Sequence, residues 1–315
     1  MPVTSDSSAN GAAPTSVLIA GASGLIGGEL VKQLTANGFA VTRLVRRTPR
    51  GADERQWDPA SGTLDPSVMD GVDAVINLSG ASIARIPWTK KYKQTILDSR
   101  LQVTSALVGA MNRAATPPTA FLSGSAVGIY GDQPSARLAD GAPEGTGFLA
   151  DVVRQWEAAA AERPAATRLV TLRTGLVIAN GGALKQLILP TKLGLAVRVG
   201  TGGQYWPWIS LHDEAAAIRH LVASRVEGPV NLAGPDPATS DRATAYLAKK
   251  LHRPYNFVFP ERIVSLVMGE AGRELLLSSQ KMVPTTLLAD GFTFRHETVE
   301  QAIDAVFEGD GAAKK

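Results

Sequence analysis

The sequence predicts an α/β protein built on a doubly wound parallel sheet, with a smaller C-terminal substrate lobe. Patterns typical of buried strands alternate with amphipathic helix patterns between residues 16 and 178, and this alternation indicates parallel strands joined by crossover helices. A glycine-rich turn joins the first strand to the first helix. After residue 178 the alternation weakens, and segments rich in glycine, proline and aromatic residues follow. These observations predict a Rossmann domain and a lobe that covers the ends of its strands.

The first strand, helix and second strand form a unit of about 30 residues, the size of a parallel crossover. Residues 17–20 are an apolar run, which predicts a buried strand. Apolar residues then recur at helical spacing, at Leu25, Ile26, Leu30, Val31 and Leu34. Asn37-Gly38 ends this helix, and "FAVTRLV" (39–45) alternates as a strand does.

The same alternation continues further along the chain. Four more segments have strand character: "DAVINLSG" (73–80), "TAFLSGS" (119–125), "RLVTLRTGLVI" (168–178) and "GPVNLAGPD" (228–236). Two long segments between them are amphipathic and predict helices: "KQTILDSRLQVTSALVGAMNR" (93–113) and "DVVRQWEAAAAER" (151–163). No internal repeat interrupts the pattern.

Composition excludes several classes of protein. The 315 residues are 44% hydrophobic and 19% charged, as in ordinary globular proteins. The sequence has no cysteine, which excludes disulfides and thiol catalysis, and its four histidines lack the spacing of metal ligands. No metal site is therefore expected. Because the N-terminus has no signal-peptide core and no stretch reaches the roughly 18 apolar residues of a membrane helix, we expect a cytoplasmic protein without a membrane partner.

The turn after the first strand predicts a dinucleotide site. Gly21, Gly24 and Gly27 form a G-x-x-G-x-x-G loop, in which the first glycine allows the tight turn, the second lets the backbone approach a pyrophosphate and the third lets helix and strand pack closely. The helix N-terminus adds N–H groups and a positive dipole. The predicted contacts of the cofactor with this loop are Gly21, Ser23, Gly24, Leu25, Ile26 and Gly27.

The end of the second strand favours NADP(H) over NAD(H). NAD binders usually place an acid there for the ribose 2′-hydroxyl, whereas this strand ends "RLVRRTPR" (43–50) with Arg46 and Arg47. Guanidinium groups pair well with a 2′-phosphate. Arg46 is the better candidate because strand alternation cannot point both side chains the same way, and Arg43 is expected to be structural. The alternative is a solvated basic run.

Small residues at the ends of two further strands complete the predicted cofactor site. "NLSGAS" (77–82) lets the chain pass close beneath the ribose and nicotinamide, although an ordinary glycine turn explains it equally well. The contacts expected here are Leu78, Gly80, Ala81 and Ser123. The basic runs are not interleaved with aromatic residues, so no nucleic-acid partner is expected. The small-molecule substrate is unknown, and the sequence leaves open whether the protein is a monomer or a dimer.

Taken in order, these motifs resemble the extended, epimerase/dehydratase branch of the short-chain dehydrogenase/reductase superfamily. The resemblance is strongest to its atypical "epimerase family" proteins, which have their own C-terminal domain. The segments that carry it are the glycine loop, "LSGSAVGIYG" (122–131), "WTKKYKQTILDSR" (88–100), "GTGGQYWPWISLHDEAAAI" (200–218), "NLAGPDPAT" (231–239) and "KMVPTTLLADGFTF" (281–294). It covers residues 16 to about 307 and implies a Rossmann fold with an NADP(H)-type cofactor.

The chain accordingly divides into five segments. We expect a disordered tail at 1–15, an NADP(H)-binding domain at 16–178 that is completed by about 206–234, and a second tail at 309–315. The substrate lobe is assigned to 179–205 and 235–308.

The superfamily's catalytic pair is missing. The resemblance implies a tyrosine with a lysine four residues later, where the lysine lowers the phenol's pKa toward neutrality. At the matching place this chain has Leu149 and Val153, or Phe148 and Val152 if the register shifts. Among the five tyrosines only Tyr246 has such a lysine, Lys250, and this pair follows the last predicted strand, so we expect it to be a surface pair.

The catalytic candidates that remain are Tyr130 and Ser125, both in "LSGSAVGIYGD" (122–132). Three readings stay open: a reductase or epimerase with a rebuilt proton donor, an NADP(H)-binding sensor without catalysis, and a structural protein stabilised by its nucleotide. Lys93 or Arg100 could assist the first, although Arg100 could equally form a local salt bridge.

Two acids have simpler interpretations. Asp58 in "QWDP" could reach the adenine or start a turn, and Asp213 in "LHDEAAAI" is expected to be a helix N-cap. The aromatic residues of "GTGGQYWPW" (200–208) could line a pocket or pack between lobes.

Overall fold

The computed structural model describes residues 15–182 and 184–312. Its centre is a seven-stranded parallel sheet in the order β12-β7-β5-β4-β1-β2-β3. The strands are β1 (Ser16–Ala20), β2 (Ala40–Val45), β3 (Glu54–Gln56), β4 (Ala74–Asn77), β5 (Ala120–Ala126), β7 (Arg168–Thr174) and β12 (Gly228–Leu232). The order reverses at β1, since β2 lies on one side of it and β4 on the other. The predicted doubly wound α/β fold is confirmed.

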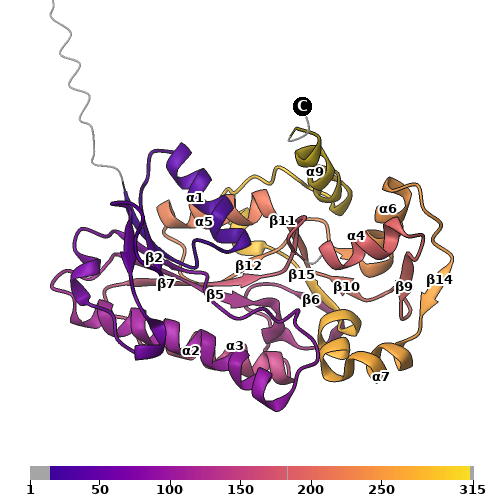
Figure 1. Ribbon diagram of the computed structural model, residues 1–315, viewed down its shortest axis with the longest axis horizontal. Helices are drawn as coiled ribbons and strands as arrows, with labels where there is room; N and C mark the ends of the chain where they lie inside the picture. The colour runs from indigo at the N-terminus through magenta and orange to yellow at the C-terminus, as the bar shows by residue number, and fades with distance from the viewer. Residues whose placement is uncertain (1–14, 183, 313–315) are drawn as a thin grey trace, which may run out of the picture.

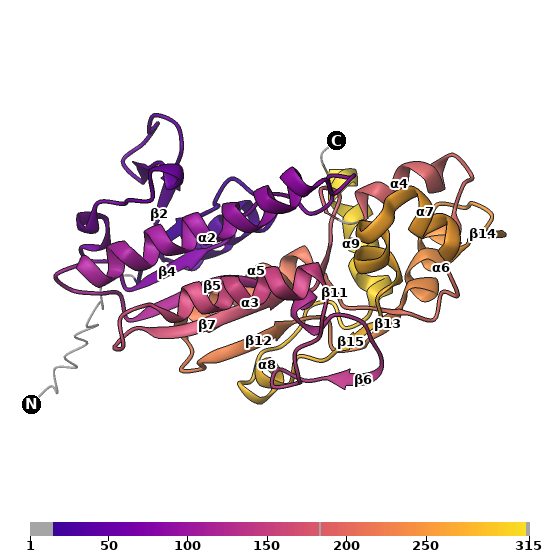
Figure 2. The ribbon, with the colours of Figure 1, turned by 90° about the horizontal axis from the view of Figure 1, so that it is seen from below.

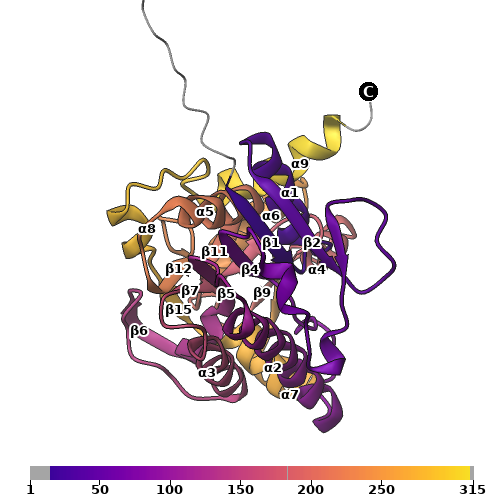
Figure 3. The ribbon, with the colours of Figure 1, turned by 90° about the vertical axis from the view of Figure 1, so that its left-hand side faces the viewer.

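Helices cover both faces of this sheet (Figures 1 and 3). On one face lie α1 (Leu25–Ala36) and α5 (Leu211–Ala223), and on the other lie α2 (Lys90–Arg113) and α3 (Phe148–Ala161). Leu30 and Leu34 of α1 share a buried cluster with Ile19 of β1, whereas Leu107 of α2 packs with Leu18. Alternate residues of β1 therefore pack into the two hydrophobic cores on opposite faces of the sheet.

The segment 168–178, predicted as one strand, forms two. A Cβ on Gly175 would lie 2.0 Å from the carbonyl oxygen of Pro207, so another segment of backbone crosses directly at this residue. Beyond it, β8 (Leu176–Ile178) leaves the main sheet and pairs in parallel with β11 (Trp208–Ser210). A strand pattern does not reveal this break, because the partner is some 30 residues away in the sequence.

The C-terminal lobe stands at one end of the sheet (Figure 2). Its elements are α4 (Lys185–Lys192), β9 (Val197–Val199), β10 (Tyr205–Trp206), β13 (Ala238–Thr239), α6 (Ser240–Lys250), β14 (Phe257–Phe259), α7 (Glu261–Gly272), the π-helical turn η4 (Arg273–Leu277) and α9 (Val299–Ala312). Next to it, β6 (Gln133–Leu138) pairs with β15 (Gln280–Met282), and α8 (Thr285–Ala289) follows. Single 3-10 turns are η1 (Pro59–Ser61), η2 (Pro66–Met69) and η3 (Val127–Tyr130).

The predicted tails have different outcomes. The N-terminal tail, apart from Thr15, lies outside the described residues, while the segment predicted as a tail from residue 309 begins inside α9, which continues to Ala312. In the part of the chain that the structure describes, every helix is too short or too polar to cross a bilayer. The same residues contain no group of three or more acidic or histidine side chains arranged to hold a metal ion.

Candidate functional site

The glycine loop between β1 and α1 packs tightly against the end of β4. Gly21 has a φ of +90°, and a Cβ there would lie 2.7 Å from the carbonyl carbon of Leu78. A Cβ on Gly27 would lie 2.3 Å from the carbonyl oxygen of Gly21. Because both nearest neighbours are backbone atoms, neither position accommodates a larger residue.

The first turn of α1 is open to solvent. Gly24 is the N-cap and makes no side-chain hydrogen bond to the helix, so the N–H groups of this turn are not used by a cap and can serve an anion. Ser23, Gly24 and Leu25 are exposed, while Gly27 is buried. The six loop residues predicted to bind the cofactor therefore lie together, and their contact with a nucleotide stays a prediction.

The arginines at the end of β2 are not equivalent. Arg47 donates to both carboxylate oxygens of Glu54 at 2.7 Å, and Arg43 lies 3.3 Å from the same carboxylate. Hydrogen bonds from the Arg47 guanidinium and then from the Arg50 N–H are the main causes that lower the pKa of Glu54 to about 2, and the charge of Arg43 adds to them. Arg43 thus has the structural role expected of it. Arg46 is exposed and has no ion pair or hydrogen bond within the described residues, so it is available to a phosphate.

Helix α2 supports the loop after β4 with two consecutive side chains. Ser99 Oγ accepts a hydrogen bond from the Ala81 N–H at 2.9 Å, and Arg100 Nη1 donates to the Ala81 carbonyl at 3.3 Å. A Cβ on Gly80 would lie 3.3 Å from Arg100 Cζ, so glycine makes room for the guanidinium. Arg100 forms no salt bridge within the described part of the chain, so the alternative that it contacts a ligand stays a prediction.

The two serines at the end of β5 are both buried. Ser123 Oγ donates to the adjacent Gly124 carbonyl at 3.3 Å. Ser125 Oγ donates to Glu157 Oε1 at 2.5 Å, and the Glu157 carboxylate accepts two hydrogen bonds from Arg173, each 3.0 Å long. Ser125 is therefore joined to a carboxylate–guanidinium pair behind the strand end.

Tyr130 is fully buried, at 0% exposed. Its hydroxyl donates to Asn231 Oδ1 at 2.7 Å and accepts from Arg173 Nη1 at 3.1 Å, and burial is the main cause that raises its pKa. A raised pKa is the reverse of what a phenol that moves protons near neutral pH needs. This geometry argues for a structural role of Tyr130, against the proton-donor role that the sequence suggests.

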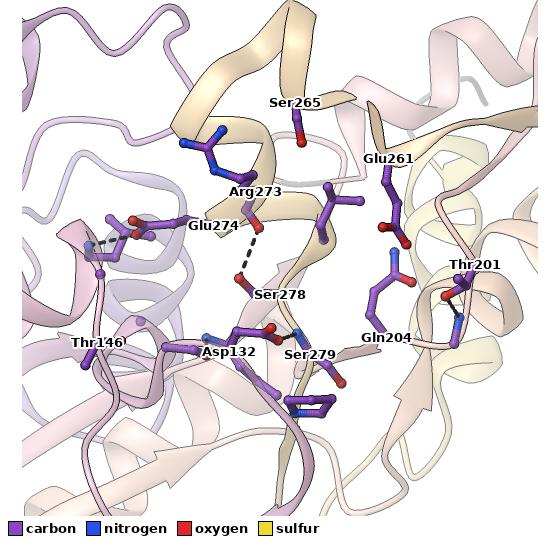
Figure 4. Close-up of a pocket in the computed structure, with 18 of the residues that line it drawn as sticks. Asp132, Thr146, Thr201, Gln204, Glu261, Ser265, Arg273, Glu274, Ser278 and Ser279 are labelled. Carbon is purple, nitrogen blue, oxygen red and sulfur yellow. Dashed lines mark hydrogen bonds between the residues drawn. The ribbon is translucent and has the colours of Figure 1, made fainter. Parts of the chain in front are cut away.

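A cavity of about 1030 Å³ lies between the Rossmann domain and α7–η4 (Figure 4). Leu149, at the place where the resemblance implies a tyrosine, lines it together with Gly128. Its polar and charged lining residues are Asp132, Thr146, Thr201, Gln204, Glu261, Arg262, Ser265, Arg273, Glu274, Ser278, Ser279 and Gln280. The aromatic residues Tyr205, Trp206 and Trp208 do not line it, and Trp206 and Trp208 are buried elsewhere. The cavity has the size of a small-molecule site.

Two carboxylates of this cavity bind backbone N–H groups. Glu274 accepts hydrogen bonds from the Phe148 and Leu149 N–H groups, each 2.8 Å long, and so caps α3 (Figure 4). Asp132 Oδ1 accepts from the Ser279 N–H at 2.8 Å. Lys93 of α2 forms a 2.7 Å ion pair with Glu270. These contacts tie α7–η4 to the Rossmann domain.

Three other sequence candidates have structural roles. Asp58 caps η1 by accepting from the Ala60 N–H at 3.0 Å. The N-cap of α5 is Ser210 and not Asp213, which corrects the prediction; the buried Asp213 instead accepts from the N–H groups of residues 295 and 296, because this segment packs against the start of α5. Tyr246 and Lys250 both bind Asp304 of α9.

Four residues of this region were not predicted from the sequence: Glu157, Arg173, Asn231 and Glu274. Arg173 lies inside an apolar strand pattern, "RLVTLRTGLVI", and a charge at a buried strand position is a signal that it has a paired partner. Glu274 had no comparable signal, because it contacts residues more than 120 positions earlier.

The parallel sheet with its glycine loop at the first crossover defines a Rossmann-like protein. The model of the NAD dependent epimerase/dehydratase family matches residues 17–233, and a domain of unknown function (DUF1731) matches residues 259–306. The chain belongs to the NAD dependent epimerase/dehydratase family, in agreement with the resemblance to atypical extended short-chain dehydrogenases/reductases.

Relatives cover nearly the whole chain. The epimerase family protein Mb2239 of Mycobacterium bovis is 39% identical over 292 residues, which are 91% of this chain and 96% of the relative. Human epimerase family protein SDR39U1 is 33% identical over 295 residues, covering 92% and 99%. The crystal structure of human SDR39U1 (isoform 2) with NADPH superimposes with a TM-score of 0.85 over 93% of this chain and 99% of that one, at 31% identity.

Proposed function

We propose that the protein binds NADP(H) and uses it in an oxidoreductase or epimerase reaction on a carbonyl or nucleotide-sugar-like substrate. The observation that carries the cofactor is the difference between the arginines after β2. Glu54, the acid near the predicted ribose site, is already neutralised by Arg47 and Arg43, while Arg46 stays free for a 2′-phosphate. The NADPH in the human SDR39U1 structure supports the same choice.

Fluorescence titration of NADPH and NADH tests this cofactor. We expect Arg46→Ala to weaken NADPH binding by about tenfold, because a charge-assisted contact of about 1.4 kcal/mol is lost. The affinity for NADH should stay unchanged. Arg55→Ala, which removes an exposed cation from neighbouring β3, is the matched control. A wild-type preference for NADH, or no loss with Arg46→Ala, contradicts the proposal.

The cavity beside Leu149 supports the substrate side of the proposal. It adjoins the ends of β5 and α3, and Arg262 and Arg273 line it without an ion pair among the described residues. Ser125 does not line this cavity, and it donates its hydroxyl hydrogen to Glu157, so we do not assign it the role of proton donor. A panel of carbonyl compounds and nucleotide sugars, followed by absorbance of NADPH, tests for turnover.

A second candidate is an NADP(H)-binding sensor without catalysis. The enclosed hydroxyl of Tyr130 and the leucine at position 149 favour it, because neither supplies a proton to the cavity. Tight nucleotide binding with no turnover across the panel would select this candidate over the first.

A further inference from the structure

Three cationic side chains, Lys93, Arg100 and Arg173, lie near the strand ends where the nicotinamide is predicted to bind. They differ in whether an acidic side chain forms an ion pair with them. Lys93 forms an ion pair with Glu270 at 2.7 Å, and Arg173 forms one with Glu157 at 3.0 Å. Arg100 has no carboxylate partner within residues 15–182 and 184–312. Arg100 is therefore the cation of α2 at this end that no acid of the described chain offsets, whereas the unpaired Arg262 and Arg273 line the cavity on the side of α7–η4.

The guanidinium of Arg100 is held in a defined place. Nη1 donates to the Ile96 carbonyl at 2.9 Å and to the Ala81 carbonyl at 3.3 Å. Arg100 Cζ stands 5.1 Å from the centroid of the Trp156 ring, and glycine at position 80 leaves the space that a side chain would fill. Burial lowers the pKa of Arg100 to about 10, so the group is still charged at neutral pH.

The loop next to Arg100 lies along the expected path of the cofactor. Gly21 of the pyrophosphate loop touches Leu78, and Gly80 and Ala81 follow two and three residues later. In a doubly wound sheet the dinucleotide crosses the strand ends at the point where the order reverses, which here is between β1 and β4. The half of the cofactor that crosses toward β4 and β5 is the nicotinamide half.

The oxidised and reduced cofactors differ by one charge, and this charge is on the nicotinamide ring. The oxidised ring is a cation, whereas the dihydronicotinamide is neutral. A fixed positive charge near the ring raises the free energy of the oxidised form alone. A cation that is paired with an acid has little such effect, because the ion pair has no net charge.

We propose that the uncompensated charge of Arg100 makes this site bind the reduced cofactor more tightly than the oxidised one. The inference rests on the proposed NADP(H) site. For charges about 10 Å apart at an effective dielectric constant of about 20, Coulomb's law gives roughly a tenfold preference. A tenfold preference raises the two-electron potential of the bound couple by about 30 mV. The bound dihydronicotinamide is then a weaker hydride donor than the free one.

The test is the ratio of two dissociation constants, measured by calorimetry with NADPH and with NADP⁺. We expect the wild type to bind NADPH about tenfold more tightly, Arg100→Gln to bring the ratio close to one, and Arg100→Lys to preserve most of it. Arg113→Gln is the matched control, since it removes a cation from the far end of the same helix and is expected to leave the ratio unchanged.

The outcomes separate this inference from the proposed function. If Arg100 only supports the Ala81 loop, Arg100→Gln weakens both forms equally and the ratio stays at its wild-type value, which overturns the inference. A wild-type ratio near one overturns it without any variant, so a variant that fails to fold does not prevent a decision. Absence of binding by either form contradicts the NADP(H) site itself.

Discussion

Two regions at the strand ends differ in how their polar groups are hydrogen-bonded: the predicted cofactor end, near α1 and β2, and the predicted reaction end, near β5. At the cofactor end, the first turn of α1 has no side-chain cap and Arg46 is unpaired within the described residues. At the reaction end, the hydroxyls of Tyr130 and Ser125 are hydrogen-bonded to other side chains. The cofactor end thus leaves its donors open to a ligand, whereas the hydroxyls at the reaction end are already hydrogen-bonded within the protein.

The largest effect is expected from Gly27→Ala at the cofactor end. The added Cβ would meet the Gly21 carbonyl oxygen at 2.3 Å, and because this neighbour is backbone, the loop itself has to move. We expect nucleotide affinity to fall by at least about 100-fold, or roughly 3 kcal/mol, when measured by NADPH fluorescence.

Gly28→Ala is the control for this substitution. Gly28 is the next residue of the same helix, and a Cβ there meets nothing within 4 Å. Since alanine is the better helix former by up to about 1 kcal/mol, this variant should melt at a slightly higher temperature and bind normally. Equal binding by both variants would show that the tight loop is not needed for the nucleotide.

Tyr130→Phe tests the reaction end, and its expected effect is smaller than that of Gly27→Ala. The substitution removes the hydroxyl that joins Asn231 to Arg173 and leaves both with an unmet hydrogen bond in a buried site. We expect the free energy of unfolding to fall by about 1–3 kcal/mol, measured by urea denaturation, with nucleotide affinity unchanged.

Tyr205→Phe is the matched control for Tyr130→Phe. The Tyr205 hydroxyl has no hydrogen bond in the described part of the chain, and its ring lies under Lys281, so its loss should cost little. If Tyr130→Phe instead lowers turnover of an identified substrate and leaves stability intact, then Tyr130 is the proton donor and the structural interpretation is wrong.

Features that depend on neighbouring residues could be predicted from the sequence, whereas features that depend on distant residues could not. The glycine loop was predictable because its three glycines act within seven consecutive residues, and Arg46 could be preferred over Arg47 because the alternation of a strand is local. The tie between Glu274 and the start of α3 was not predictable, since the partners are more than 120 residues apart.

A single sequence also gives the residue but not its environment. Tyr130 sits in a segment where a catalytic tyrosine is plausible, and only the fold shows that its hydroxyl points toward Asn231 and Arg173. The break at Gly175 is similar, because its cause is the carbonyl of Pro207, which lies between β10 and β11.

A pH-dependent effect is expected at Glu214, a further polar group at the reaction end. It is fully buried on α5, where Oε1 accepts from Thr174 Oγ1 at 2.8 Å and Oε2 has no partner within the described residues. Burial raises the pKa of Glu214 to about 8, from a usual value of 4.5. Between these values the folded protein keeps a proton that the unfolded chain releases, so stability should fall as the pH rises.

Glu214→Gln removes this dependence, because an amide does not ionise. The lost slope is up to about 1.4 kcal/mol per pH unit, and urea denaturation at pH 5, 6.5 and 8 measures it. Glu54→Gln is the contrasting control: the pKa of Glu54 is lowered to about 2, so this carboxylate is ionised in both folded and unfolded chains above pH 5 and its loss should shift stability equally at all three values. If the slope of Glu214→Gln matches the wild type, Glu214 is charged in the folded protein, and the reaction end then contains an acid that is free to exchange a proton.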